Sequence, residues 1–208
     1  MAFYNRTKDR HTFVASFAGR PEAQFAIYAR GYREAAARLT QQLCLATHFA
    51  DYEAYPVVFL YRHALELTLK SVILAASELA GLTFDRAVVS GLRAHHDLDR
   101  LGLEVVNIVA KWFPEDGQTL AYAAQIRTVC SELQALDPAS DAYRYPAKPK
   151  GEASTKPNQD VNLRDLATGV EPVLDLLDGA EAALRRQTEC AADSRLFMEE
   201  LFVRIANG

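Results

Sequence analysis

Apolar residues recur every three or four positions along most of the chain, whereas the alternation typical of half-buried strands is scarce. This spacing predicts helices. The first would have Pro21 in its opening turn and one apolar face running from Phe25 to about His48. The second would begin at Pro56 and end at Gly81, which can adopt a left-handed stop. Because this second helix is apolar almost all round, we expect it to be the buried centre of the fold.

Two further helices are bounded by prolines. One is predicted to start near His96 and Asp97 and to end before Pro114. The next follows Asp116 and ends before Pro138.

The last third of the chain predicts an irregular segment followed by a long helical region. Residues 137–161 contain four prolines and are expected to form a long loop. Asn162 begins a capping pattern, and the helical region after it is expected to reach Phe202. Pro172 and Gly179 should kink or split this region.

Length and composition are consistent with one domain. With 208 residues, half of them hydrophobic, the chain can bury one substantial core. We therefore expect an all-α, single-domain helical bundle over residues 1–208, with residues 1–19 irregular. The net charge of −4 gives no general attraction for nucleic acids, so phosphate binding would need a local cluster of basic residues.

The three cysteines indicate a reducing compartment. Cys44, Cys130 and Cys190 are widely spaced in apolar stretches, which predicts reduced, packed thiols without a disulfide or a zinc site. No apolar run long enough to span a membrane follows the polar N-terminal residues. We expect a cytoplasmic protein without a metal or other cofactor.

A polar stripe on the second predicted helix is the strongest local signal. Arg62, Glu66 and Lys70 are spaced by four, and His63 lies beside them. On a surface helix these would be ordinary ion pairs. Here the neighbouring residues are so apolar that part of the stripe should be enclosed, and an enclosed Glu66 should then have a basic partner. Such a stripe is either a buried structural network or a functional site.

Two short polar segments could supply partners from outside that helix. His95, His96 and Asp97 precede the third predicted helix, where a cap or a surface imidazole is the simple alternative. Arg144 and Tyr145 belong to the long loop, where the arginine could instead pin the loop through a carboxylate. Arginine and histidine side chains gathered together would suit a phosphate.

The segments YPVVFLYRHALELTLKSVI, HHDLDRL and DAYRYP followed by VNL resemble a bacterial branch of the HEPN-like (higher eukaryotes and prokaryotes nucleotide-binding) domains, over roughly residues 55–178. The resemblance implies a helical bundle that forms a homodimer and binds RNA or a nucleotide. It also implies a metal-independent ribonuclease or a partner of a second protein encoded nearby. The nuclease signature of that superfamily, an arginine and a histidine separated by a short spacer, is matched formally only by Arg6 and His11, because His63 directly follows Arg62.

The first hypothesis is therefore a site in which a histidine moves a proton and an arginine neutralises charge on phosphorus. Such a site requires its groups to converge on one cleft. The candidate catalytic residues are Arg62, His63, Glu66, His96 and Arg144, supported by Lys70, Asp97 and Tyr145.

Two other hypotheses compete with it. In one, the chain is a non-catalytic interaction or dimerisation domain, and the stripe is a saturated internal network. In the other, His63, His96 with Asp97, and Asp137 are metal ligands in the order found in HD-type phosphohydrolases, which are also helical.

Overall fold

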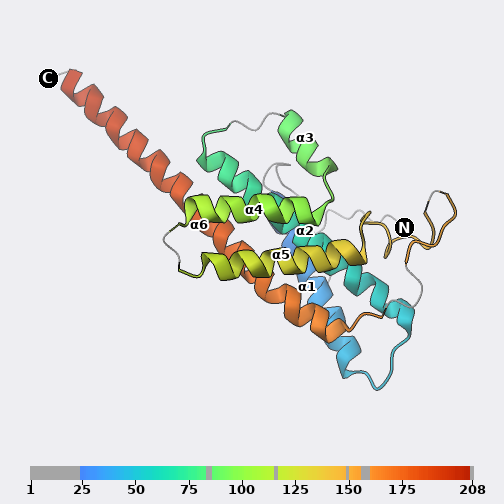
Figure 1. Ribbon diagram of the computed structural model, residues 1–208. Helices are drawn as coiled ribbons and strands as arrows, with labels where there is room; N and C mark the ends of the chain where they lie inside the picture. Colours follow the sequence, from blue (N-terminus) through green and yellow to red (C-terminus); the bar gives the residue numbers. More distant parts are fainter. Residues whose placement is uncertain (1–23, 83–85, 115–116, 149, 156–159, 207–208) are drawn as a thin grey trace, which may run out of the picture.

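The all-α fold is confirmed by the computed structural model, which describes residues 24–82, 86–114, 117–148, 150–155 and 160–206 (Figure 1). Within these residues there is no strand, only an isolated bridge between Ala147 and Ala153. No described helix combines the length and apolar content needed to cross a membrane. The helices are α1 (Gln24–Leu45), η2 (Asp51–Glu53, a 3-10 turn), α2 (Ala54–Leu79), α3 (Arg86–Ala94), α4 (Leu98–Trp112), α5 (Thr119–Leu136) and α6 (Leu163–Ala206).

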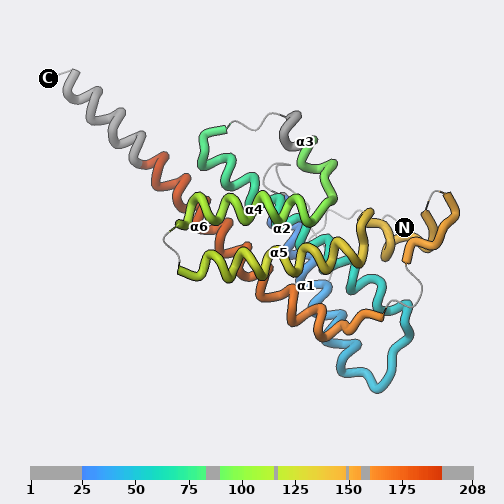
Figure 2. The backbone as a smooth tube through the Cα atoms, viewed as in Figure 1, coloured from blue at the N-terminus to red at the C-terminus, as the bar shows by residue number. Residues whose placement is uncertain are grey.

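Helix α2 is the buried centre, as its apolarity predicts. It packs against α1, α4 and α6, and most of its side chains from Val57 to Ala76 are buried. Helices α4 and α5 lie side by side and close another side of the core (Figure 2). The polar stripe therefore lies on the helix that other elements enclose most completely.

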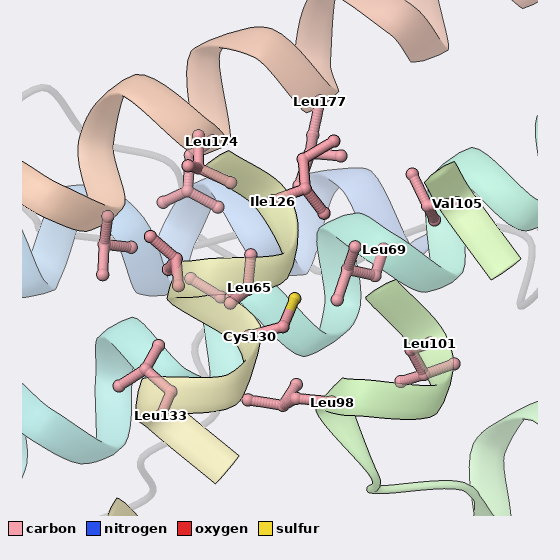
Figure 3. Packing of buried hydrophobic residues seen from close by; sticks show 14 of the residues in the cluster. Leu65, Leu69, Leu98, Leu101, Val105, Ile126, Cys130, Leu133, Leu174 and Leu177 are labelled. Carbon is pink, nitrogen blue, oxygen red and sulfur yellow. The ribbon is translucent and has the colours of Figure 1, made fainter. Parts of the chain in front are cut away.

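The core lies where α2, α4, α5 and α6 meet (Figure 3). Leu65 and Leu69 of α2 are fully buried, and they lie among apolar side chains of the other three helices. Cys130 of α5 is also in this cluster, and it packs closely against Gly102 of α4. The residues contributed by the neighbours include Leu98, Leu101, Val105, Ile126, Leu133, Leu174 and Leu177.

The helices differ from the predicted pattern at two places. The sequence pattern did not predict α3, a helix of nine residues that contains Gly91 and is too short to show a sustained period. Helix α6 is not split at Pro172 or Gly179 but continues through both. Proline removes one backbone hydrogen bond there. Val173, Leu174 and Leu177 are buried beside it, so tertiary packing holds the helix together.

The predicted boundaries hold to within a few residues. Helix α1 ends at Leu45 rather than at about His48, and Gly81 has the positive φ (75°) expected of the stop after α2. The described residues of the 137–161 segment form the predicted irregular connection. The predictions for Pro21, for residues 1–19 and for the Arg6–His11 spacing lie outside the described residues.

The thiols differ in their surroundings. Cys130 is buried, and burial raises its pKa to about 12. Cys44 is half-buried, whereas Cys190 is exposed, so the prediction of packed thiols is wrong for Cys190.

Candidate functional site

The polar stripe of α2 is enclosed and paired. The side chains of Arg62, Glu66 and Lys70 are 0%, 1% and 2% exposed. Arg62 Nη1 donates to Glu66 Oε2 at 3.0 Å, and Lys70 Nζ donates to Glu66 Oε1 at 2.7 Å. The predicted basic partner of Glu66 is thus confirmed, and the stripe is not a solvated surface.

Arg62 ties α2 to the histidine segment before α4 and to the start of the 137–161 loop. Its Nη2 donates to the carbonyl oxygen of His96 at 2.8 Å, just before α4. On the other side, Nε donates to the carbonyl of Asp137 at 3.1 Å and Nη1 donates to Ser140 Oγ at 2.8 Å. Because most of its N–H donors are engaged by the protein, Arg62 fixes the backbone around the site.

Asp137 organises the start of the 137–161 loop. Its Oδ1 accepts hydrogen bonds from the backbone amides of Asp141 and Ala142 at 3.0 and 3.1 Å, and its Oδ2 lies 3.6 Å from Arg62 Nε. In the turn between Asp137 and Asp141, Ser140 has a φ of 60°.

The side chain of Asp97 is also engaged in a hydrogen bond. It accepts from the backbone amide of Arg100 and so caps the N-terminus of α4. Among the described residues, no three His, Cys, Asp or Glu side chains are placed to hold a metal ion. The ligand set of the phosphohydrolase hypothesis is therefore not assembled in this part of the chain.

Glu66 also orients His96. The Nδ1 of His96 lies 2.9 Å from Glu66 Oε1, and the imidazole is about half exposed. Burial raises the pKa of Glu66, but the hydrogen bonds and charges of Lys70 and His96 outweigh this and lower it. An ionised Glu66 accepts a hydrogen bond from the Nδ1–H of His96. The Nε2 of His96 is then the nitrogen that faces a ligand.

His63 is the second imidazole of the site. It stacks on Phe59 with ring centroids 5.5 Å apart and meets Tyr32 edge-on at 4.6 Å. Burial lowers the pKa of His63, and this outweighs the nearby carboxylate of Glu66, which raises it. The ring is therefore neutral at pH 7, and it makes no hydrogen bond to any described residue.

These groups line one cavity of about 350 Å³ beside α1 and α2. The cavity reaches solvent at Tyr28, Arg93 and His96, whose side chains are exposed. One wall is aromatic and comes from α1, and the imidazoles and the cations come from α2, α3 and the segment before α4. Its lining residues are Phe25, Tyr28, Tyr32, His63, Glu66, Leu67, Lys70, Arg93 and His96.

The predicted convergence holds for only part of the set. His63, Glu66, Lys70 and His96 share the cavity, but Arg62 lies behind it and is fully buried. Nor do Arg144 and Tyr145 line it. The guanidinium of Arg144 lies over the ring of Phe59, 5.6 Å from its centroid, and 5.5 Å from that of Tyr145.

Sequence reasoning missed Arg93 and the aromatic wall. The apolar face predicted for the first helix supplies this wall, and Tyr28 on that face is exposed in the cavity. Arg93 stands two positions before the histidine pair, which was the one available signal.

Together, the fold and the site define an all-α bundle with an open cavity built around two histidines and a buried carboxylate. Comparison with protein-family models, with curated proteins and with solved structures finds no match to this chain.

Proposed function

We propose that this chain is a HEPN-like protein that binds a nucleotide, free or as a unit of RNA, in the cavity between α1 and α2. The observation that carries the proposal is the combination of an aromatic wall with histidines and cations in one open cavity. Bases stack on aromatic side chains, and phosphates bind to cationic donors. The size of the cavity suits a ligand of this class.

The charges in and around the cavity favour an anion at its rim. Glu66 and Asp137 balance the charges of Arg62 and Lys70 in the buried network. Arg93 is exposed at the rim, and its guanidinium makes no hydrogen bond or ion pair with the described residues. A planar guanidinium of this kind can bind a phosphate through two parallel hydrogen bonds.

The two histidines equip the same cavity for metal-independent cleavage. A neutral His63 would accept the proton of a ribose 2′-hydroxyl, whose oxygen attacks phosphorus. A doubly protonated His96, held by Glu66 through its Nδ1–H, would donate its Nε2 proton to the departing 5′-oxygen. The products would be a 2′,3′-cyclic phosphate and a 5′-hydroxyl, and Lys70 and Arg93 would stabilise charge on the phosphorane.

One observation supports the competing function, a non-catalytic interaction domain. Arg62 is fully buried, and its guanidinium donates four hydrogen bonds to neighbouring acceptors. A structural network accounts for Arg62, Glu66 and Lys70 without any ligand. From the resemblance we further propose a cytoplasmic homodimer that works with a protein encoded by a neighbouring gene.

The deciding experiment measures binding and cleavage of labelled RNA in excess chelator. Arg93→Ala should weaken binding by about tenfold, as expected for the loss of one charged contact. His63→Ala and His96→Ala should abolish cleavage and largely preserve binding. Arg127→Ala, an exposed arginine on α5, is the control. If the folded wild type binds neither RNA nor nucleotides, the interaction-domain function replaces this proposal.

A further inference from the structure

A groove follows the seam between α5 and α6, two helices that do not line the cavity described above. It consists of three hollows of about 540, 390 and 270 Å³. Gln125 and Pro172 line both the first and the second hollow. Val129 and Gly169 line both the second and the third. On α6 the groove covers residues 166–183, which is about five turns, or about 27 Å, of helix.

The groove is mainly apolar, and it has room for side chains of another molecule. A Cβ at Gly169 or Gly179 would meet no neighbouring atom within 4 Å. A continuous apolar surface of this length is typical of a protein interaction site, and the apolar face of a helix fits such a groove. The larger apolar residues that line it are Val109, Phe113, Leu136, Leu166 and Leu176.

The charged side chains along the groove are acidic. Glu132, Asp160 and Asp165 line the hollow at the start of α6, and all three are exposed. Asp175 lines the hollow at the other end, where it is paired with Arg33. Within the part of the chain that the structure describes, no lysine or arginine lines the groove. The three carboxylates at the start of α6 therefore favour a partner with positive charge.

Pro172 adds a backbone acceptor to the middle of the groove. Because proline has no N–H, Pro172 cannot donate to the carbonyl of Thr168, four residues earlier in α6. Both residues are exposed and line the middle hollow. The carbonyl of Thr168 thus lacks its usual helical donor, and a lysine or arginine of a bound molecule can supply one.

We propose that this groove binds an amphipathic helix of a partner protein, with lysines or arginines beside the apolar face of that helix. The apolar face packs on the floor of the groove, and the basic side chains lie next to Glu132, Asp160 and Asp165. The proposal goes beyond the function proposed for the cavity. It does not depend on a nucleotide there, because neither α5 nor α6 lines the cavity.

The test measures the binding of fluorescent helical peptides to the full chain. The basic probe has leucines at a spacing of three and four residues, with lysines beside them. One reference peptide has the same composition in an order without an apolar face, and the other has glutamate in place of lysine. The wild type should bind the basic probe at least about tenfold more tightly than either reference, and added salt should reduce the preference over the acidic peptide.

Matched variants locate the binding in the groove. Gly169→Leu and Gly179→Leu place a side chain in it and should weaken binding by about tenfold, whereas Gly31→Leu on α1 should bind as the wild type. All three positions have space for a Cβ, so the variants should fold, which circular dichroism checks. Glu132→Lys should weaken binding of the basic probe, and Glu104→Lys, at an exposed position on α4, should not.

Several results would overturn this proposal. They are equal affinity for the basic probe and either reference peptide, or unchanged binding by both Gly169→Leu and Gly179→Leu. Sedimentation supplies a further one: a wild-type dimer that Gly169→Leu converts to a monomer would show that a second copy of the chain covers the groove. None of these results bears on the cavity, whose ligand the RNA assay tests separately.

Discussion

Arg62 carries a full positive charge at a position with no exposed surface. Removing such a charge from water costs several kcal/mol, so the surrounding groups must compensate. Glu66 supplies the opposite charge, and the carbonyls of Asp137 and His96 supply further acceptors. Arg62 therefore acts on the site by fixing its neighbours.

Replacing Arg62 should chiefly affect stability. Arg62→Met is expected to lower the free energy of unfolding by about 3 to 5 kcal/mol, because Glu66 and Asp137 lose their buried partner. Urea denaturation at pH 7 measures this, and the exposed Arg127→Ala should stay within about 0.5 kcal/mol of the wild type. A loss below about 1 kcal/mol for Arg62→Met would contradict the structural role.

His63 should make stability depend on pH. Burial holds its folded pKa below the ordinary 6.5, so the unfolded chain binds more protons, and stability falls as pH drops below about 6.5. Glu66 acts in a separate pH range. Because its folded pKa is lowered from 4.5, the stability that it contributes is present above about pH 4.5 and is lost only below it. His63→Gln should reduce the loss of unfolding free energy between pH 7 and pH 5. Identical pH dependence in both proteins would show that His63 is not penalised when protonated.

At the scale of the elements, long helices were predictable and their mutual orientation was not. The all-round apolar pattern of α2 predicted a buried helix, and Asp97 predicted the start of α4. An all-round apolar helix, however, does not show which of its faces meets which neighbour. For that reason the polar stripe was predictable as enclosed, but the burial of Arg62 behind the cavity was not. The aromatic wall depends on the long-range packing of α1 on α2, which local periodicity does not contain.

Close packing of α4 on α5 makes Gly102 a sensitive position. A Cβ there would lie 2.7 Å from Cys130 Sγ and 3.2 Å from Cys130 Cβ. Gly102→Ala should therefore lower the free energy of unfolding by about 1 to 3 kcal/mol, despite the better helix propensity of alanine. Thermal and urea unfolding measure the effect.

Two further variants test the cause. Gly179→Ala on α6 meets nothing within 4 Å, so it should raise stability by up to about 1 kcal/mol. Cys130→Ala should relieve most of the cost of Gly102→Ala in the double variant. If the two substitutions are simply additive, the contact with Cys130 is not the cause.

The whole molecule depends on how α1 is attached, because α1 supplies the aromatic wall of the cavity. Arg33 of α1 forms ion pairs with three carboxylates of α6, and its Nε donates to Glu171 Oε2 at 2.7 Å. Glu171 also accepts from Tyr61 of α2 at 3.0 Å. This cluster fastens α1 to two other helices at one place.

Breaking the cluster should loosen α1 more than the rest of the bundle. Arg33→Ala is expected to lower the free energy of unfolding by about 1 to 2 kcal/mol, because three carboxylates lose a shared, partly buried cation. Hydrogen exchange should accelerate more in α1 than in α5, and nucleotide affinity should fall as the aromatic wall becomes less ordered. The control is Arg38→Ala, whose exposed pair with Glu34 within α1 is worth about 0.5 kcal/mol or less. Equal acceleration in α1 and α5 would mean that α1 opens only with the whole bundle, and Arg33 would then contribute to global stability without controlling access to the cavity.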